Sequence, residues 1–279
     1  MLHGCFTGVE STPRITQTSE QRKAIAATAE ERLMAEVEPE SLDQWRQGKK
    51  FTVTDSKIYM VLSPASAAQS LVAGSELNYQ TYHKSVSALG DTLLTLTFTS
   101  DGINEPMTYS LPAGDYPQIP FTVEQSLVNH ANLLLNGRTL YVLTAERMNG
   151  VVGNKFSAVR VTDVTTGDED MPLVVRFREI ASGDSSAIRL SLSGSRTFSN
   201  SFSITDPHKA YPNISDEMWQ QIRSGQVCEG MTREECRLAL GSTTDVNRFT
   251  NHGVIEERWT YPNGIYLIFR DNILTHFRR

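Results

Sequence analysis

The middle of the chain, from about residue 51 to residue 204, alternates between apolar and polar positions. Short runs of β-branched and apolar residues recur there, separated by clusters of Gly, Asp, Asn and Ser, and they begin at Phe51, Leu94, Thr139, Leu173 and Ile188. A period of two is typical of strands that bury one face. The pattern therefore predicts antiparallel β-sheet with one buried face and one solvated face.

Two stretches of this middle part are similar to each other. Residues 47–53, Gln-Gly-Lys-Lys-Phe-Thr-Val, match the pattern of residues 136–142, Asn-Gly-Arg-Thr-Leu-Tyr-Val, and each leads to a later run that ends in Phe, at Phe98 and at Phe177. A repeated pattern favours an internal duplication. We expect two related β-rich units, 40–130 and 131–205. Two unrelated strands that begin after a Gly-basic turn would look alike, and this alternative stays open.

Residues 18–39 have helical periodicity. The apolar residues of one face recur every four positions: Ile25, Ala29, Leu33 and Val37. Thr18, with Gln21 three residues later, predicts a capping box at the start of one amphipathic helix, and Pro39 predicts its end. The opposite face mixes Glu with Arg, which favours a packing helix over one that lies on a membrane surface.

The last part, 206–279, changes to helical signals followed by strand signals. Ser215 predicts the N-cap of a helix over 213–225, and Thr232 with Glu235 predicts a capping box for a second helix that ends at Gly241. Three alternating runs then predict the strands 255–261, 265–270 and 273–277, joined by turns rich in Asn, Asp and Gly. The expected fold class is α+β: an N-terminal helix, two small antiparallel β-rich units and an αα-βββ unit.

Several motifs of this last part occur together in a known family. They are Gly230-Met231-Thr232-x-x-Glu235, Leu240-Gly241, Trp259-x-Tyr261, and Leu267-x-Phe269 followed by a turn and Ile273. In order and spacing they resemble the BamE family, also called SmpA or OmlA. These are small outer-membrane lipoproteins of the β-barrel assembly machinery in Gram-negative bacteria. The αα-βββ shape is also similar to the repeats of the β-lactamase inhibitor proteins. The resemblance covers about a fifth of the chain and implies the fold of that part.

The first five residues, Met-Leu-His-Gly-Cys, resemble the end of a bacterial lipoprotein signal. The motif Leu-x-Gly-Cys implies that the thiol of Cys5 carries a lipid that anchors the protein to the outer membrane, within the cell envelope. Residues 1–17 would then be the lipidated start and a polar tether. The alternative is a cytosolic protein with an isolated cysteine near its start. With the BamE resemblance, the whole chain looks like the multi-domain lipoproteins of unknown function of gut Gram-negative bacteria.

Composition narrows the classes of partner. The chain has 26 Lys and Arg against 32 Asp and Glu, a formal net charge of -6, which argues against nucleic acid. No apolar run reaches the roughly 18 residues of a membrane-spanning helix. The absence of a CxxC pair excludes a zinc ribbon. In an oxidising compartment Cys228 and Cys236 would be able to form a disulfide, and two reduced, partly buried thiols are the alternative.

Candidate chemistry is sparse. The sequence lacks the spacings HxxxH, GxSxG, GxxxxGK[ST] and GxGxxG, so no metal, cofactor or catalytic residue is predicted. Asp206-Pro207-His208 is interpreted as a turn rather than as part of a catalytic site. The acidic segment 163–170 is interpreted as a solvated turn, with a weak cation site as the alternative. Four aromatic side chains of the last part are expected mostly in the core because the unit is small, with Tyr266 the most exposed, and a candidate interaction surface is the alternative: Trp259, Tyr261, Tyr266 and Phe269.

These observations lead to three functional hypotheses. The first is a non-enzymatic cell-envelope lipoprotein that acts as a protein-interaction or scaffolding module. The second is a periplasmic or surface inhibitor or ligand-binding module that uses the sheet face of the αα-βββ unit. The third is a hydrolase with a spatial triad, in which His83, His130 or His208 would have to meet a carboxylate and a nucleophile.

Overall fold

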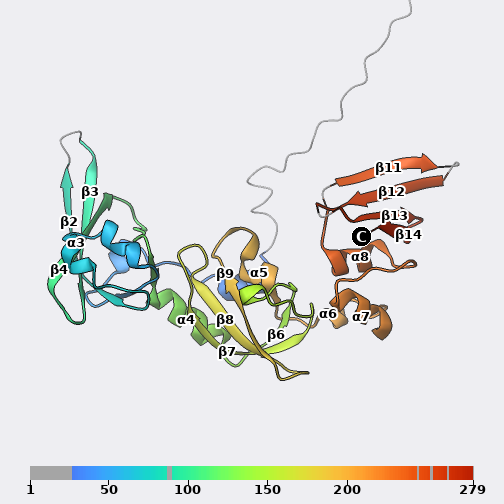
Figure 1. Cartoon of the computed structure of the whole chain (residues 1–279), viewed down its shortest axis with the longest axis horizontal. Helices are drawn as coiled ribbons and strands as arrows, with labels where there is room; N and C mark the ends of the chain where they lie inside the picture. Colours follow the sequence, from blue (N-terminus) through green and yellow to red (C-terminus); the bar gives the residue numbers. More distant parts are fainter. Residues whose placement is uncertain (1–26, 87–89, 244, 252–253, 263, 279) are drawn as a thin grey trace, which may run out of the picture.

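Three antiparallel sheets lie in a row along the protein (Figure 1). The computed structural model describes residues 27–86, 90–243, 245–251, 254–262 and 264–278. In this part of the chain, seven α-helices, α2 to α8, accompany the sheets, and each sheet has a buried core of its own. The predicted α+β class is confirmed. No helix among the described residues has the length and apolar character needed to cross a bilayer.

The first unit is a five-stranded sheet in the order β4-β3-β2-β1-β5. Leu94, Leu96 and Phe98 alternate along β3 and are fully buried, as their period of two predicts. Short helical turns precede β1 and fill the β1–β2 connection. The elements are η1 (Leu42–Gln44), β1 (Lys50–Val53), η2 (Ser56–Met60), α3 (Ala65–Ala68), β2 (Glu76–Val86), β3 (Thr92–Ser100), β4 (Ile103–Pro112) and β5 (Thr122–Glu124).

The second unit is a five-stranded sheet in the order β10-β6-β7-β8-β9 with α4 packed on it. The elements are α4 (Gln125–Leu135), β6 (Thr139–Val142), η3 (Met148–Gly150), β7 (Ala158–Thr166), β8 (Leu173–Glu179), β9 (Ser185–Leu190), η4 (Gly194–Arg196), α5 (Phe198–Ser201) and β10 (Phe202–Ser203). The predicted boundary at 130/131 falls inside α4. Every buried residue of α4, including Leu127 and Val128, lies in the second core, so this helix belongs to the second unit.

The two sheets have the same topology. In each, four strands form a meander and the fifth returns to pair with the first. Before the first strand, Gly48 and Gly137 both have positive φ, 86° and 76°, and their N–H groups donate to the carbonyls of Tyr79 and Val161. The register shifts directly after Tyr79 in β2 and directly after Val161 in β7. Such a common register is what a duplication produces; the duplication itself stays a prediction.

The third unit packs two helices on a four-stranded sheet. It comprises α6 (Pro207–Ala210), α7 (Asp216–Arg223), α8 (Arg233–Leu240), β11 (Asp245–Asn251), β12 (Val254–Thr260), β13 (Tyr266–Arg270) and β14 (Ile273–Arg278). Ser215 caps α7, and Thr232 with Glu235 forms the capping box of α8, as the sequence predicts. The prediction of three strands is wrong, because β11 adds a fourth. The side chains of residues 245–250 are all exposed, so this edge strand has no buried face to produce an alternating pattern.

The helix predicted over 18–39 is not continuous in the described residues. α2 (Ala29–Met34) begins at Thr28, whose extended backbone and capping box with Glu31 start a helix there. One continuous helix over 18–39 is therefore wrong for the described residues, since the helix starts after Thr28 and ends well before Pro39. The predicted cap at Thr18 lies outside the described part of the chain.

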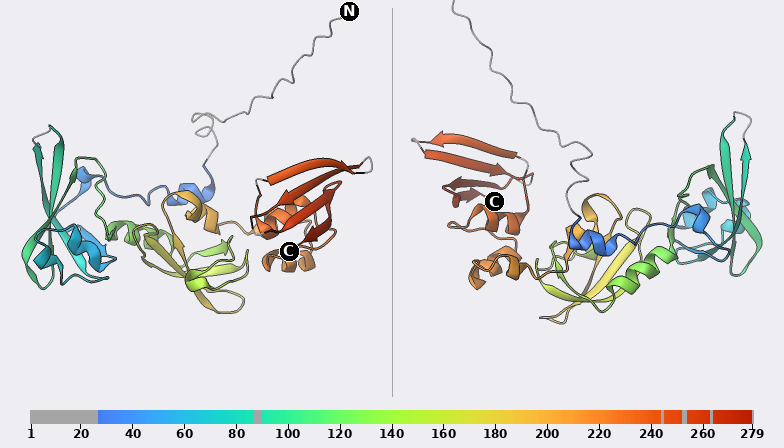
Figure 2. Two further views of the ribbon diagram at one scale, coloured as in Figure 1. Left: turned by 45° about the horizontal axis from the view of Figure 1, so that its top comes forward. Right: turned by 180° about the vertical axis from the view of Figure 1, so that it is seen from behind.

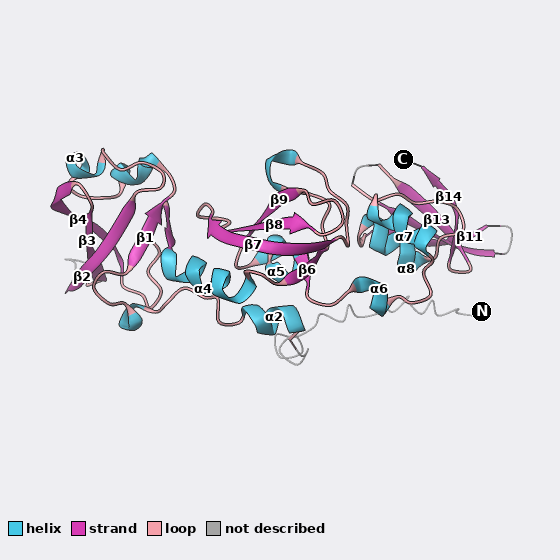
Figure 3. Cartoon of the chain, turned by 90° about the horizontal axis from the view of Figure 1, so that it is seen from below, coloured by secondary structure: helices cyan, strands magenta, loops and turns pink. Residues whose placement is uncertain are grey.

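The N-terminal segment packs on the second unit before the chain enters the first. Leu33, Met34 and Val37 contact the second core, and the carboxylate of Glu30 accepts hydrogen bonds from the Ser203 hydroxyl and the Ile204 N–H. The chain then forms the first unit and returns through α4 (Figures 2 and 3). Two chain segments therefore connect the first two units, whereas one segment, between β10 and α6, connects the second unit to the third.

Candidate functional site

The candidate interaction surface of aromatic residues is mostly inside the third unit. Trp259 and Phe269 are 2% and 0% exposed and pack against each other, with 4.7 Å between ring centroids. Tyr261 is buried and donates to the Gly241 carbonyl at 3.0 Å, while Tyr266 is half-buried. The expectation of core burial therefore holds for Trp259, Tyr261 and Phe269, and the alternative of an exposed surface is wrong for them, because α7 and α8 lie against their face of the sheet.

The cysteines of the third unit are free thiols. Cys228 is half-buried and Cys236 is fully buried, and they are not joined in this structure. Burial raises the pKa of the Cys236 thiol to about 12, and the negative charge of Glu235 acts in the same direction. Cys236 therefore behaves as a small core residue. The predicted lipidation site, Cys5, lies outside the described residues.

His208 is the histidine with the closest polar partners in the described residues. Its Nδ1 lies 2.9 Å from Asp206 Oδ1, and its Nε2 lies 2.6 Å from Arg223 Nη2. With its proton on Nδ1, the ring donates to Asp206 and accepts from Arg223. Asp206 is also the N-cap of α6, which agrees with the interpretation of this segment as a turn. Both ring nitrogens are occupied, so this imidazole has no free nitrogen with which to take a proton from a nucleophile.

The other predicted chemistry is not brought together. His83 and His276 are exposed, and His130 faces Glu36 at 3.6 Å on the surface. Asp168, in the acidic segment, accepts from the Met171 N–H and forms an ion pair with Arg189 at 2.6 Å. Among the described residues, no three His, Cys, Asp or Glu side chains are placed to bind a metal.

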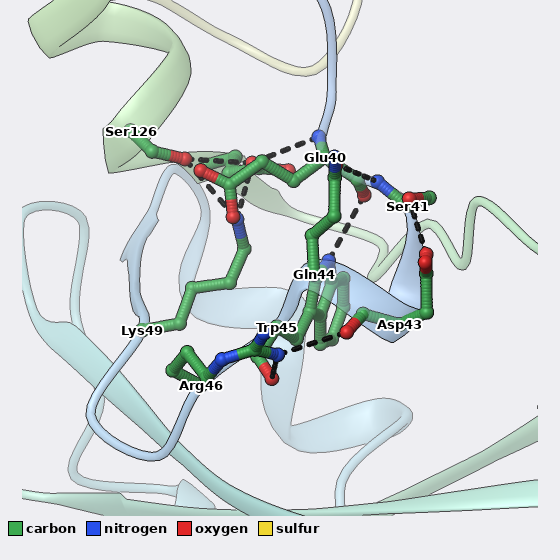
Figure 4. A network of polar contacts seen from close by, with 9 residues as sticks. Glu40, Ser41, Asp43, Gln44, Trp45, Arg46, Lys49 and Ser126 are labelled. Atoms are coloured by element: carbon green, nitrogen blue, oxygen red, sulfur yellow. Dashed lines mark hydrogen bonds and ion pairs between the residues drawn. The ribbon is translucent and has the colours of Figure 1, made fainter.

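The first joint between units is built around a buried lysine (Figure 4). The Lys49 side chain is 5% exposed; its ammonium donates to Glu124, to Glu40 at 2.7 Å and to the Ser126 hydroxyl at 3.1 Å. The Glu124 carboxylate also accepts the Glu40 N–H at 3.2 Å. The lysine follows Gly48, so the turn before β1 aims it at this point. The ring of Trp45 lies 5.4 Å from the ammonium and supplies a cation–π contact.

This Lys49 cluster lies at the two segments that connect the first and second units. Glu40 belongs to the segment that enters the first unit, Glu124 ends β5, the last strand of that unit, and Ser126 lies in the first turn of α4, through which the chain leaves it. One ammonium therefore ties both connections together. Buried, multiply bonded charges of this kind favour a single arrangement, because separating them leaves a charge without its partner.

The second joint also uses a lysine, which is half-buried. Lys155, in the loop before β7, donates from its ammonium to the carbonyls of Leu238 and Ala239 at 3.2 and 3.0 Å. These are carbonyls of the last turn of α8, which carries the negative end of the helix dipole. Burial lowers the pKa of Lys155. Phe156, the next residue, is 7% exposed and packs in the third core, with its ring centroid 5.7 Å from that of Trp219.

Sequence reasoning missed both lysines as joint residues. The sequence indicates Lys49 only as part of a Gly-basic turn, and it contains no signal for Lys155. Their partners lie far away along the chain: Lys49 and Glu124 are 75 residues apart, and Lys155 and Leu238 are 83 apart. No local spacing encodes such a contact, so only the fold reveals it.

A comparison of the sequence with models of protein families found no match, and comparisons with curated proteins and with solved structures found none either. The resemblance of the third unit to the BamE family, and that of the whole chain to multi-domain lipoproteins, therefore stay predictions.

Proposed function

We propose that this protein is a non-enzymatic cell-envelope lipoprotein, anchored through Cys5, whose three units form a scaffold that presents protein-interaction surfaces. The observation that carries this proposal is that two lysines largely removed from water, Lys49 and Lys155, both lie where units are joined. Removing a charge from water costs free energy, and in this protein both of these charges lie where they fix one unit relative to the next. A fixed row of small units suits a protein that holds partners at set positions.

Two further features support the scaffold over the alternatives. The imidazole of His208 is engaged at both nitrogens, which counts against a hydrolase triad at that residue. The aromatic face required by an inhibitor that uses the third sheet is covered by helices, with Trp259 and Phe269 in the core. The motif Leu2-x-Gly4-Cys5 supports the anchor, and the helical pair packed on a sheet agrees with the implied fold of a BamE-like unit.

The anchor is tested by mass spectrometry of the N-terminal peptide from protein isolated with the membranes of its native host. We expect a lipid-modified Cys5 and a protein that fractionates with the outer membrane. A Cys5→Ser variant is the control and should lose both properties. An unmodified Cys5 in a protein recovered wholly in the cytosol would overturn the localisation.

The scaffold is tested by photo-crosslinking from exposed positions on the outer units, such as Met60 in the first unit and Ile255 in the third, which are 67% and 69% exposed. Crosslinks from both ends to the same envelope complex are expected. Lys49→Ala should loosen the first joint and so reduce the yield of protein that is crosslinked to the complex from both positions at once. Circular dichroism should show that the variant stays folded. Crosslinking that is absent from both positions in intact cells would overturn the proposed role.

A further inference from the structure

A hollow on the second unit is lined by three arginines. Its volume is about 320 Å³, and an adjoining hollow of about 270 Å³ shares four of its lining residues, Glu146, Ile188, Arg189 and Arg196. Arg147 belongs to the larger one. We call the two together the arginine hollow. The three arginine residues come from separate parts of the chain: Arg147 from the loop after β6, Arg189 from β9 and Arg196 from η4.

The first unit shows that Arg147 is unusual for its position. Asp55 in the first unit and Thr144 in the second use their side chains in the same way, each accepting from the N–H two residues further on, Lys57 and Glu146. The next residue in the first unit is Ile58, which is 0% exposed. At the matching position, the second unit has Arg147.

Arg147 is a buried cation where the equivalent residue is apolar. It is only 7% exposed, and its guanidinium donates to the carbonyls of Thr144 and Asn154, at 2.8 Å for the latter. Among the described residues, no carboxylate lies within ion-pair distance of it, and the charge of Glu179 acts on it from further away. Burying a cation without a paired anion is unfavourable, whereas an isoleucine at this position, as in the first unit, carries no such cost. An anion bound beside Arg147 would offset this cost.

The other two arginines place more positive charge at the same hollow. Arg196 holds both oxygens of Glu146 from one nitrogen at 2.9 Å, and Arg189 holds Asp168 at 2.6 Å. Arg147 adds a third cation, whose hydrogen-bond partners are carbonyls and on which the charge of Glu179 also acts, in a chain whose formal net charge is -6. The registers of the strand pairs place Ser110 of the first unit at the position equivalent to Arg189 of the second. The pair of arginines Arg147 and Arg189 is therefore specific to the second unit.

We propose that the arginine hollow binds an anionic group, a phosphate or a carboxylate, with Arg147 beneath it and Arg189 and Arg196 at its sides. Guanidinium groups bind such oxyanions in a planar, two-point geometry. The anion is either a free small molecule or an acidic side chain of a partner that docks on the second unit. This site is independent of the lipid anchor and of the joints, so its failure and that of the proposed function are distinguishable.

The test uses the folded protein and inorganic phosphate at constant ionic strength, followed by isothermal titration calorimetry. Saturable binding is expected for the wild type and for Arg178→Gln, an exposed arginine of β8 outside the hollow. Affinity should fall at least tenfold in Arg189→Gln and in Arg147→Met, which keeps a side chain of similar length without the charge. Circular dichroism checks the fold of Arg147→Met, and Arg189→Gln carries the test if that variant unfolds.

A second titration, with a glutamate-rich peptide, identifies the source of the anion. Tighter binding of the peptide than of phosphate, lost in Arg189→Gln, indicates an acidic partner segment. Tighter or equal binding of phosphate, with the same loss, indicates a small anion. The proposal is overturned if neither probe saturates, or if Arg189→Gln and Arg178→Gln bind equally well, which would indicate an adventitious ion only.

Discussion

At the scale of single residues, neighbouring lysines have opposite roles. Lys49 is 5% exposed and bonded to two carboxylates, whereas the side chain of Lys50, the next residue, is half exposed and forms one ion pair with Glu76. Exposed pairs contribute little because water competes for both partners, while removing one member of a buried pair leaves the other charge desolvated and unpaired. The sequence shows two adjacent lysines and gives no reason to treat them differently.

We therefore expect Lys49→Met to lower the free energy of unfolding by about 3 kcal/mol, since Glu124 would keep a buried charge. The urea midpoint of Lys50→Met, the matched control, should hardly move. A double variant, Lys49→Met with Glu124→Gln, should recover much of the loss. Equal midpoints for the two single variants would contradict the assigned role of Lys49.

Glu257 gives a pH-dependent prediction. Its side chain is 6% exposed, and burial opposes its charge, but hydrogen bonds from Arg248 and the Trp259 indole, with the nearby charge of Arg233, outweigh burial and hold the pKa of its carboxyl below the usual 4.5. A lowered pKa means that the charged form stabilises the folded state above about pH 4.5, and that this stabilisation disappears as pH falls through the lowered pKa.

Glu257→Gln should accordingly cost about 1–3 kcal/mol at pH 7, the range for hydrogen bonds to a charged group. The difference from the wild type should shrink as pH falls below about 4.5, measured by denaturant unfolding between pH 3 and pH 7. Glu234→Gln, at an exposed position of α8, is the control. A wild-type advantage that stays constant over this pH range would show that charge on Glu257 is not the source.

At the scale of elements, local chemistry predicted helix starts well. The Thr232 hydroxyl accepts from the Glu235 N–H at 3.2 Å, and the Glu235 carboxylate accepts from the Thr232 N–H at 2.6 Å, as the motif implied. The same motif at Thr28, with Glu31, starts α2, but the sequence pattern does not indicate it because the apolar period of four runs through this position without a break. β11 escaped prediction because strand signals depend on a buried face, which this edge strand lacks.

The capping box makes a prediction for α8. Thr232→Ala removes the acceptor for the Glu235 N–H and should lower the free energy of unfolding by about 1 kcal/mol. Amide hydrogen exchange should quicken first at the N-terminal end of α8. Thr250→Ala, on the exposed strand β11, is the control and should leave both quantities close to the wild type. Unchanged exchange in α8 after loss of the cap would contradict this account.

At the scale of the whole molecule, the sequence predicted the order of the units but not their connections. The strand pattern and the Gly-basic turns before β1 and β6 indicated two β-rich units, and turn residues at Asp206 and Pro207 marked the start of the third. What it did not show is that the segment before the first unit packs on the second, through Leu33, Met34 and Val37. Such contacts join residues that are far apart in the sequence. Periodicity shows which face of an element is buried, but it does not show which other element packs against that face.

The second joint allows the row arrangement to be tested. Phe156 belongs to a loop of the second unit but is buried in the core of the third, and Lys155 caps the last turn of α8 from the same loop. Phe156→Ala removes a large buried side chain and should cost about 3–5 kcal/mol. Because the lost contacts lie between units, the loss should separate the unfolding of the third unit from that of the second.

Calorimetry should therefore show one coupled transition for the second and third units in the wild type and two in Phe156→Ala. Hydrogen exchange should quicken in α7 and α8 and stay unchanged in β1 to β5. Val152→Ala, in the same loop and 79% exposed, keeps the backbone context and should behave like the wild type. The contrary result is a wild type that already shows separate transitions for the two units, which Phe156→Ala does not change. In that case the second joint is not a fixed connection, and only the first joint fixes units of the scaffold relative to each other.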